Sequence, residues 1–140
     1  MSSGDCIFCK IASGAIPAQT VLESDDCIAF LDIAPLSPGH CLLVPKRHFD
    51  SFDRMPADVA ASVLSRLSGL GKAVQAATGA DGFNILLNSG KAAGQEIMHV
   101  HIHVIPRKEG DGLGYRWLPK SLDDATADAL RRRIMTELGG

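Results

Sequence analysis

One segment, His99 to Ile105, constrains this chain more than any other, because it holds three of the five histidines at every second position. Valine and isoleucine fill the remaining positions, and these β-branched residues favour strands. In a strand, side chains two residues apart share a face and lie roughly 6.5 to 7 Å from each other. A helix would scatter the same three side chains around its axis. The segment therefore predicts a strand with three imidazoles on one face.

Three imidazoles on one strand face are open to three interpretations. They can bind a transition metal, or they can supply a nucleophile and the groups that support it. They can also form a polar strand surface that merely faces solvent. The last interpretation fits a single histidine better than three in register on an otherwise apolar strand, so we expect chemistry at this segment.

The composition is that of one soluble globular domain. A chain of 140 residues, 46% hydrophobic and 21% charged, can bury a core of its own. Its net charge of −2 and isoelectric point near 6.2 offer no basic surface for duplex nucleic acid, so a nucleotide would need a local site. The start of the chain lacks the features of a signal peptide, and no apolar run approaches the roughly 20 residues of a membrane span. We therefore expect a cytoplasmic enzyme or binding module, with neither nucleic acid nor membrane as a partner.

The four cysteines fall into two kinds. Cys27 and Cys41 lie in apolar runs, where a cysteine is usually buried as a small hydrophobic residue. Cys6 and Cys9 form a Cys-x-x-Cys pair, which is the spacing of a metal-binding knuckle. The same spacing occurs in redox pairs, but the βαβ context of such motifs is missing here.

Hydrophobic periodicity predicts one α+β domain, a five-stranded antiparallel sheet with helices on one side. The segment 40–45 is apolar almost throughout and is therefore expected in the middle of the sheet. The predicted strands are 20–23, 27–33, 40–45, 83–88 and 99–105. The predicted helices are a short one at 7–13, a long amphipathic one at 56–78 that packs on the sheet, and a last one that begins at Ser121 with Asp124 in its capping box.

The segment His99–Ile105 matches the H-φ-H-φ-H-φ-φ signature of the histidine triad (HIT) superfamily, in which φ is an apolar residue. The resemblance extends over nearly all of residues 5–107 and points to the Hint-like branch that carries a Cys-x-x-Cys zinc site. Other segments that resemble this branch are Ile7–Ile11, Ile16-Pro17, Phe30–Ile33, Pro38–His40, Val44–Lys46 and Gly94-Gln95. The resemblance implies a single HIT domain over residues 1–140, with its core at about 5–107 and a variable C-terminal tail at 108–140.

The resemblance implies a nucleotide hydrolase or transferase. Such an enzyme cleaves nucleoside phosphoramidates or dinucleoside polyphosphates and releases a nucleoside monophosphate, here AMP, through a covalent nucleotidyl-histidine. His101 aligns with the central histidine of the signature and is the expected nucleophile, with His103 on the α-phosphate. His40 matches the family's fourth active-site histidine, and His99 completes the catalytic set. An attacking imidazole needs an acceptor on its other nitrogen, which in the family is a backbone carbonyl near the triad.

The resemblance also places the nucleotide, for which we expect a purine. Asn88 matches an amide that contacts phosphate, and Gly94 and Gln95 match a loop whose backbone N–H groups face the anion. Asp32 matches the acid that accepts hydrogen bonds from both ribose hydroxyls. The chain departs from the family at Glu96, where a Ser or Thr that reaches the leaving group is common, and this departure can change the preferred substrate. The expected apolar walls of the base pocket are Phe8, Ile11, Phe30, Leu31 and Ile33.

Zinc and a second copy of the chain complete what the resemblance implies. The zinc ligands would be Cys6, Cys9, His48 and His99, in a closed structural site that ties the N-terminus to the triad strand. The family also implies a homodimer in which two five-stranded sheets join, with the helix at 56–78 as the candidate interface. Two alternatives remain open at this point. One is a nucleotide-binding module with little turnover, and the other is a metal-dependent hydrolase in which the three triad histidines hold a catalytic ion.

Overall fold

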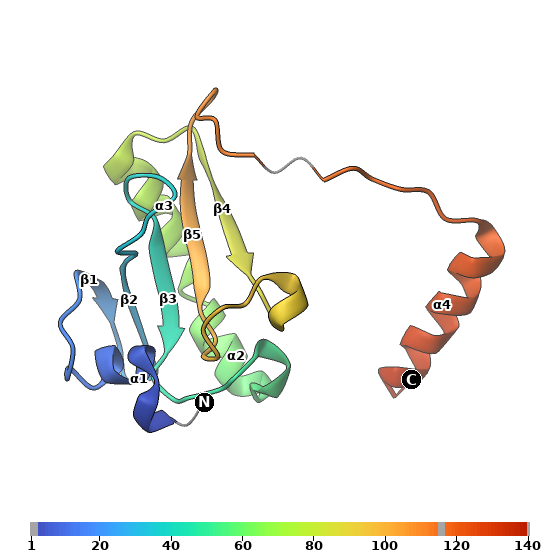
Figure 1. The fold of residues 1–140 in the computed structure, drawn as a ribbon, viewed down its shortest axis with the longest axis horizontal. Coiled ribbons are helices and arrows are strands. Elements are labelled where there is room, and N and C mark those ends of the chain that lie inside the picture. The colour runs from blue at the N-terminus through green and yellow to red at the C-terminus, as the bar shows by residue number, and fades with distance from the viewer. Residues whose placement is uncertain (1–2, 115–116, 140) are drawn as a thin grey trace.

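A five-stranded antiparallel sheet lies at the centre of the computed structural model, which describes residues 3–114 and 117–139 (Figure 1). The strands are β1 (Thr20–Glu23), β2 (Cys27–Leu31), β3 (Cys41–Pro45), β4 (Gly82–Leu87) and β5 (Ile102–Arg107), and their order across the sheet is β1-β2-β3-β5-β4. β3 is the middle strand and is buried along its whole length, which confirms the prediction from its apolar run. The predicted α+β fold is confirmed, although β2 ends earlier than predicted.

The register of the strands aligns four side chains across one face of the sheet. Phe30 on β2 pairs with Leu42 on β3. Leu42 pairs in turn with His103 on β5, which pairs with Leu86 on β4. Because paired residues point to the same side of a sheet, these four side chains form one row. We call the side that carries this row the site face.

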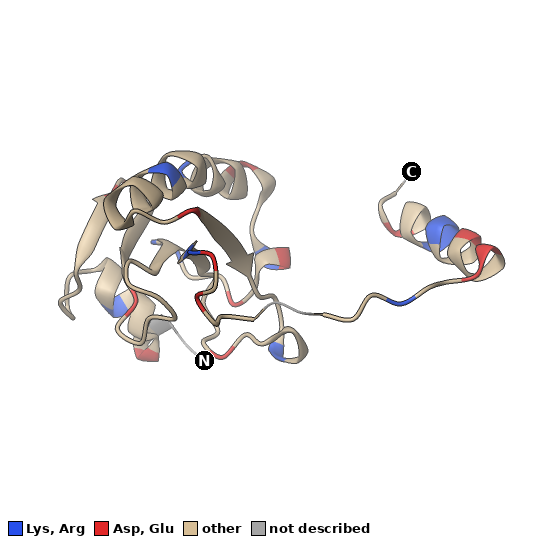
Figure 2. Ribbon diagram, turned by 90° about the horizontal axis from the view of Figure 1, so that it is seen from above, with Lys and Arg blue, Asp and Glu red and all other residues tan. Residues whose placement is uncertain are grey.

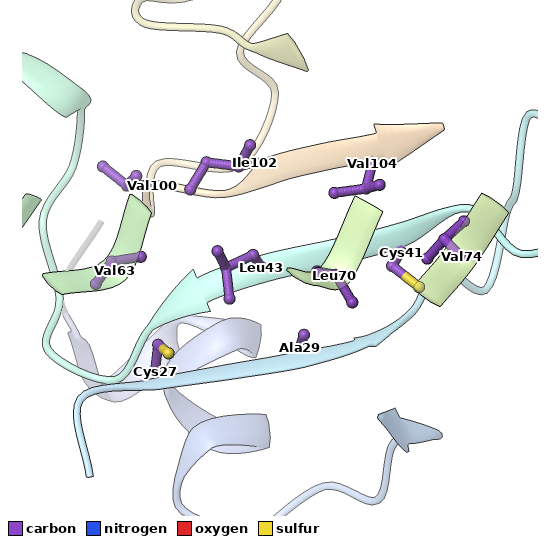
Figure 3. Packing of buried hydrophobic residues seen from close by; sticks show 10 residues of the cluster. All are labelled: Cys27, Ala29, Cys41, Leu43, Val63, Leu70, Val74, Val100, Ile102 and Val104. Atoms are coloured by element: carbon purple, nitrogen blue, oxygen red, sulfur yellow. The ribbon is translucent and has the colours of Figure 1, made fainter. Parts of the chain in front are cut away.

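The opposite face of the sheet carries the main hydrophobic core, under helices α2 (Ala57–Leu64) and α3 (Leu67–Thr78) (Figure 3). The buried core residues are Cys27, Ala29, Cys41, Leu43, Val63, Leu70, Val74, Val100, Ile102 and Val104. The two cysteines among them are therefore buried as small hydrophobic residues, as predicted. α3 approaches the sheet closely at Gly71, where a Cβ atom would overlap the Phe83 ring.

A short helix, α1 (Ile7–Ala12), packs on the site face, so the prediction that the helices share one side of the sheet is wrong. Its one buried residue is Phe8. This side chain belongs to a second, smaller core with Cys6, Ile28, Phe30, Leu42 and Val44. Cys6 caps the start of α1, since its Sγ accepts a hydrogen bond from the N–H of Cys9. The Cys-x-x-Cys pair thus brackets the residue that anchors the helix.

The predicted long helix at 56–78 is wrong in one respect, because the segment forms two helices. At the break, the N–H of Arg66 donates to the carbonyl of Val63 instead of to that of Ser62. The Ser65 hydroxyl also donates to the Ser62 carbonyl, at 2.6 Å. A serine that bonds to its own helix backbone competes with the helical ladder. This local competition explains a break that apolar periodicity could not show.

The predicted strand at 99–105 is shorter than expected. β5 begins too late to contain two of the three histidines, and only His103 lies within it. His101 directly precedes the strand, while His99 lies in a bend. The N–H of Val100 donates to the carbonyl of Phe49 at 2.9 Å, which separates this part of the chain from the sheet ladder. His101 and His103 therefore act together, whereas the His99 ring turns elsewhere.

The last helix, α4 (Asp124–Glu137), projects away from the sheet at the end of an extended arm (Figures 1 and 2). Asp123 caps it by accepting a hydrogen bond from the N–H of Thr126 at 2.9 Å, so the predicted start at Ser121 is too early. α4 contains no buried residue along its fully described length. Residues 115 and 116 of the predicted tail lie outside the described part of the chain.

The remaining features of the fold concern its connections and its charges. Among the described residues, single-turn 3-10 helices lie before α1 at Ser3–Asp5 and in connecting segments at Phe52–Arg54 and Lys91–Ala93. Acidic and basic residues are interspersed along the helices and loops (Figure 2). Among the helices in the described ranges, none combines the length and the apolar character that a membrane crossing needs.

Candidate active site and metal cluster

A cavity of about 430 Å³ lies between α1 and the site face of the sheet. All four side chains of the row across the sheet line it, together with His101. Of the residues predicted to contact nucleotide, only Gln95 lies outside the lining. Those that line the cavity are Phe8, Ile11, Phe30, Leu31, Asp32, Ile33, Asn88, Gly94 and His103.

The cavity walls also contain residues that the sequence did not single out for a ligand. They are Ile7, Ile16, Pro17, Ala18, Leu36, Leu42, Leu86 and Ile97. Alternation along two strands could have identified Leu42 and Leu86, because their side chains share a face with His103. Leu36 lies in a loop, where no periodicity marks it.

One ring nitrogen of His101 bonds to the backbone, and the other has no part in that bond. Its Nδ1 lies 2.7 Å from the carbonyl oxygen of His99. Since a carbonyl oxygen only accepts hydrogen bonds, Nδ1 carries the proton, and the neutral ring has its lone pair on Nε2. Edge-to-face contacts with Phe8 and His103, each at 5.1 Å between ring centroids, hold the ring in place. His101 lines the cavity, and the tautomer of its neutral ring places the lone pair on Nε2.

A chain of hydrogen bonds sets the proton positions of His40 and His103. The N–H of Leu36 donates to Nδ1 of His40 at 3.0 Å, so this nitrogen carries no proton. The neutral His40 ring is then protonated on Nε2, which donates to Nδ1 of His103 at 2.9 Å. His103 is left with its own proton on Nε2. In the same cavity, His103 thus offers a donor where His101 offers a lone pair.

The hydrogen-bond chain requires both rings to be neutral, and their surroundings make them so. Burial lowers the pKa of His40. Burial, reinforced by the charges that His101 and His40 can carry, lowers the pKa of His103 to about 4. The carboxylate of Asp32 acts in the opposite direction on both rings but does not outweigh burial. Both histidines are therefore uncharged near pH 7.

Two polar side chains lie at opposite ends of the row, since Asp32 follows β2 and Asn88 follows β4. One carboxylate oxygen of Asp32 accepts a hydrogen bond from the N–H of Ala34 at 2.9 Å and builds a turn. The other lies 3.6 Å from Nε2 of His40, beyond a good hydrogen bond. That second oxygen is therefore available to a ligand.

Gln95 has a structural position instead of a place in the cavity. Its side chain is 2% exposed. Its amide oxygen accepts from the N–H of Gly90, and its amide nitrogen donates to the carbonyls of Asp50 and Ile97. The backbone N–H groups of Gly94 and Gln95, which the sequence assigned to an anion, donate to carbonyls of their own loop. Gln95 thus fixes the shape of the loop that carries Gly94 into the cavity.

Cys6, Cys9, His48 and His99 form a compact cluster whose ligand atoms all lie within 4.8 Å of one another. Nδ1 of His99 lies 3.3 Å from Sγ of Cys6 and 3.5 Å from Sγ of Cys9. Nδ1 of His48 lies 3.3 Å from Sγ of Cys9 and 3.2 Å from Nδ1 of His99. A tetrahedral zinc ion, with bonds of about 2.3 Å to sulfur and about 2.0 to 2.1 Å to nitrogen, holds its ligands roughly 3.3 to 3.8 Å apart. The spacing fits such an ion.

The outer nitrogens of the two cluster histidines both have acceptors. Nε2 of His99 donates to the carbonyl of Pro45 at 2.8 Å, and Nε2 of His48 donates to the carboxylate of Asp50 at 2.7 Å. The two Nδ1 atoms therefore carry lone pairs that converge. Burial raises the pKa of Cys9 to about 11 and lowers that of His99 to about 4, so without an ion Cys9 is a thiol and the His99 ring is neutral. Four donors aimed at one point fit a cation that would replace the thiol protons.

A second group, Asp32, His40 and His103, is also close enough to hold an ion, but its hydrogen bonds fit one poorly. For Nε2 of His40 to bind a metal, its proton would have to move to Nδ1, which already accepts from the N–H of Leu36. The three triad histidines do not form a metal group within the described residues, since His99 belongs to the cysteine cluster. This arrangement argues against a hydrolase in which the whole triad binds one catalytic ion.

Comparisons of the sequence connect the chain to known proteins. Residues 13–110 match the family model of the HIT domain. The adenosine 5'-monophosphoramidase HNT1 of Candida albicans is 34% identical over 142 residues, which cover 98% of this chain and 93% of that protein. The adenylylsulfatase HINT3 of Arabidopsis thaliana is 47% identical over 118 residues, which cover 84% of this chain and 58% of that longer protein.

Solved structures resemble the chain over almost its full length. A crystal structure of a Streptococcus mutans protein has a TM-score of 0.94 and 38% identity, covering 98% of this chain and 87% of that one. A zinc-bound histidine triad family protein from Mycobacterium smegmatis has a TM-score of 0.76 and 35% identity, covering 99% and 98% of the two chains.

Proposed function

Because the chain belongs to the HIT family, we propose that it is a nucleotide hydrolase or transferase that releases AMP through a covalent adenylyl-histidine. Its substrates would be nucleoside phosphoramidates or dinucleoside polyphosphates. The observation that carries the proposal is the hydrogen bond of 2.7 Å from Nδ1 of His101 to the carbonyl of His99, which selects the tautomer of the neutral ring whose lone pair is on Nε2. The relatives named as an adenosine 5'-monophosphoramidase and an adenylylsulfatase support AMP as the product.

His101 carries out both chemical steps in this proposal. In the first, its Nε2 attacks the α-phosphorus, a nitrogen–phosphorus bond forms, and the bond to the leaving group breaks while a leaving amine takes a proton from solvent. The ring becomes positively charged, so its Nδ1–H donates more strongly to the His99 carbonyl and stabilises the charge. In the second, water attacks the same phosphorus, the bond to His101 breaks, and AMP leaves. Dividing one displacement into two lowers each barrier.

His103 and His40 support the phosphate in this scheme. The Nε2–H of His103 would donate to a non-bridging α-phosphate oxygen, where negative charge develops in the transition state. With a pKa of about 4, His103 does so as a neutral donor. His40 is 2% exposed and is not part of the cavity lining. We therefore assign it as a positioning residue that acts through His103.

The row across the sheet sets where each part of the nucleotide would lie. Within this row, Phe30 on β2 and His103 on β5 are two strand spacings apart, or roughly 10 Å. We assign the purine to the apolar end, between Phe8 and Phe30, and the phosphate to the histidine end, beside Asn88. The free carboxylate oxygen of Asp32 would accept hydrogen bonds from the ribose hydroxyls.

Glu96 gives a preference among leaving groups. Its exposed carboxylate lines the cavity and would repel an anionic leaving group such as sulfate or a nucleotide. An amine that leaves a phosphoramidate is neutral or cationic. We therefore propose phosphoramidates as the preferred substrates. In a competition assay, Glu96→Gln should raise turnover of adenylyl sulfate relative to a phosphoramidate about 3- to 10-fold, and an unchanged ratio would contradict this preference.

We also propose a structural zinc ion on Cys6, Cys9, His48 and His99. Two thiolates and two imidazoles are a common ligand set of closed zinc sites. Once bound, the ion would crosslink the N-terminal segment, the chain after β3 and the start of the triad. The zinc-bound relative from Mycobacterium smegmatis supports this choice of metal. Metal analysis should find one zinc per chain and none in Cys6→Ser, and full occupancy in that variant would refute the ligand set.

A homodimer is a further part of the proposal, with the α2–α3 surface as the candidate interface. The apolar side chains of Leu130 and Ile134 on α4, and of Leu138 directly after it, are exposed in the single chain, and a second copy would cover apolar surface of this kind. Sedimentation should give twice the chain mass of 14.8 kDa. A single-chain mass at all concentrations would overturn the dimer. A cytoplasmic location stays a prediction from the sequence.

Trapping the covalent intermediate tests the central proposal. Wild-type protein mixed with adenosine 5'-phosphoramidate and quenched in alkali should carry one adenylyl group on the peptide that contains His101. His101→Gly should lose both adduct and turnover, and added imidazole should restore turnover by entering the space of the missing ring. Arg131→Ala on the exposed α4 is the control that should match wild type. Equal turnover of wild type and His101→Gly without imidazole would favour the second candidate, a nucleotide-binding module.

A further inference from the structure

We infer that the cluster of Cys6, Cys9, His48 and His99 positions the nucleophile His101, so that filling the cluster with a metal ion sets the activity of the separate nucleotide cavity. The inference rests on the proposed function, because it concerns the orientation of the ring that attacks phosphorus. Its basis is that two links of the chain connect the cluster to His101.

The first link is the main chain of His99, which serves both sites at once. Its ring contacts both cysteines of the cluster and is held by the carbonyl of Pro45 at 2.8 Å. Its own carbonyl oxygen accepts the Nδ1–H of His101 at 2.7 Å. The carbonyl and the ring belong to one residue, so a change in the position of the ring turns the peptide group that orients the nucleophile.

Apart from the ring, that peptide group is restrained by one backbone hydrogen bond, which its own N–H, that of Val100, makes. His99 lies in a bend before β5, outside the sheet ladder. Its N–H donates to the nearby carbonyl of Ile97, and the next N–H, of Val100, donates to Phe49 in a loop. Neither bond belongs to a regular element. The orientation of the carbonyl that fixes His101 therefore depends on the His99 ring together with the Val100–Phe49 bond, and the ring depends on the cluster.

The second link is Phe8, which lies between the two cysteines in sequence. Its ring makes edge contacts with both the cluster and the nucleophile, at 5.8 Å from the His99 ring and 5.1 Å from the His101 ring. Phe8 also lines the cavity. α1 has only six residues, too few for a helix that is stable by itself. The second core anchors Phe8, and Cys6 and Cys9 on either side of it tie α1 to the His99 ring as well.

These links predict what loss of the metal would do without any direct contact between the cluster and substrate. The His99 ring and α1 would each lose their common anchor, so His101 and the Phe8 wall would sample more orientations. Changes to groups that orient a site from behind typically cost 10- to 100-fold in activity or affinity. We expect a loss of about this size in the adenylyl-transfer step, together with weaker binding of AMP, while the nucleophile itself is intact.

The test compares three variants for metal content, adduct formation and the state of the His101 ring. Cys9→Ser removes a ligand that touches both cluster histidines. His48→Gln removes a ligand but keeps both thiols and His99, so it serves where the first variant fails to fold. Cys27→Ser is the control, because it makes the same substitution at a buried cysteine that belongs to the core on the opposite face.

Nitrogen-15 NMR of labelled histidine gives a readout that a purely structural role would not move. In wild type with one equivalent of zinc, His101 should show one slowly exchanging Nδ1–H. Cys9→Ser and His48→Gln should bind less metal, exchange the His101 Nδ1 proton faster, and form the adenylyl adduct about 10- to 100-fold more slowly. Cys27→Ser should keep the metal, the signal and the rate. Removing zinc from wild type with a chelator, then restoring it, should reproduce the change reversibly.

Three results would overturn the inference. One is a wild-type protein that takes up no metal at the cluster. Another is loss of the metal with no change in the His101 signal or in the rate of adduct formation. The third is an equal loss in Cys27→Ser, which would mean that any damage to the core acts in the same way. If wild type forms no adduct at all, the proposed function fails instead, and the exchange rate of the His101 proton still decides whether the cluster positions the ring.

Discussion

Two pairs of histidines in this molecule have nearly equal spacing and opposite hydrogen-bond character. Nδ1 of His48 lies 3.2 Å from Nδ1 of His99, and Nε2 of His40 lies 2.9 Å from Nδ1 of His103. In the first pair both nitrogens carry lone pairs, which suits a metal ion. In the second pair one nitrogen donates and the other accepts, which suits a relay toward a phosphate.

The cause of the difference lies outside each pair. Pro45 and Asp50 provide acceptors for the outer nitrogens of the first pair, so both protons point outward. Leu36 provides a donor for the outer nitrogen of His40, so its proton points inward. A group of histidines is therefore identified as a metal site or a relay by the partners of its outer nitrogens, and short distances between rings are not enough.

Metal removal should have the largest effect on the free energy of unfolding, and this effect should depend on the pair His48–His99 and not on the pair His40–His103. If zinc is present at about 1,000 times its dissociation constant, binding to the folded state adds about 4 kcal/mol to the free energy of unfolding. Urea unfolding of wild type at pH 7, with and without a chelator, should show that difference. His40→Gln should retain it and Cys9→Ser should lose it. If His40→Gln lost the zinc dependence, the ion would bind at His40 and not at the cysteine cluster.

Acid should destabilise the protein through the second pair. The pKa of His103 falls from 6.5 to about 4 on folding, so between these values the unfolded chain binds a proton that the folded chain does not. The free energy of unfolding therefore decreases as the pH falls from about 6.5 to about 4, by up to about 3 kcal/mol for this group. The lowered pKa of His40 acts with the same sign. Across this range, the free energy of unfolding of His103→Gln should depend less steeply on pH than that of wild type. An unchanged dependence would show that other groups cause the loss of stability in acid.

The smallest predicted change in the free energy of unfolding comes from a substitution that lets the pair His40–His103 present lone pairs, as the pair His48–His99 does. Leu36→Pro removes the N–H that donates to His40, at a cost of about 1 kcal/mol. His40 can then carry its proton on the outer nitrogen and present a lone pair to His103 and Asp32. Titration with zinc should show a second, weaker equivalent in this variant and one equivalent in wild type. A second equivalent already in wild type would mean that the Leu36 N–H does not exclude a metal.

The sequence predicted those parts of the fold and site that depend on local pattern. Alternation put His101 and His103 on a common side, and the apolar run at β3 placed that strand in the middle of the sheet. The Cys-x-x-Cys spacing identified two members of the cluster. The other two, His48 and His99, came from the resemblance, because no periodicity connects residues so far apart in the chain.

The errors concern features decided by a single hydrogen bond or by a distant partner. β5 starts late because Val100 bonds to Phe49 in another segment. The helix at 56–78 breaks where the Ser65 hydroxyl bonds to its own backbone. The backbone N–H groups of Gly94 and Gln95 were expected to face an anion, yet they donate to carbonyls of their own loop. None of these contacts changes the hydrophobic pattern from which the elements were predicted.

The alternation along β3 has a consequence for anyone who wishes to change this protein. Leu42 lines the cavity proposed to bind the nucleotide, while its neighbour Leu43 is buried in the core under α2 and α3. In a library that varies the strand one position at a time, selection for a new base should therefore enrich changes at Leu42, and selection for heat resistance should act on Leu43. Base specificity and thermal stability can thus be changed separately by substitutions at two adjacent positions of one strand.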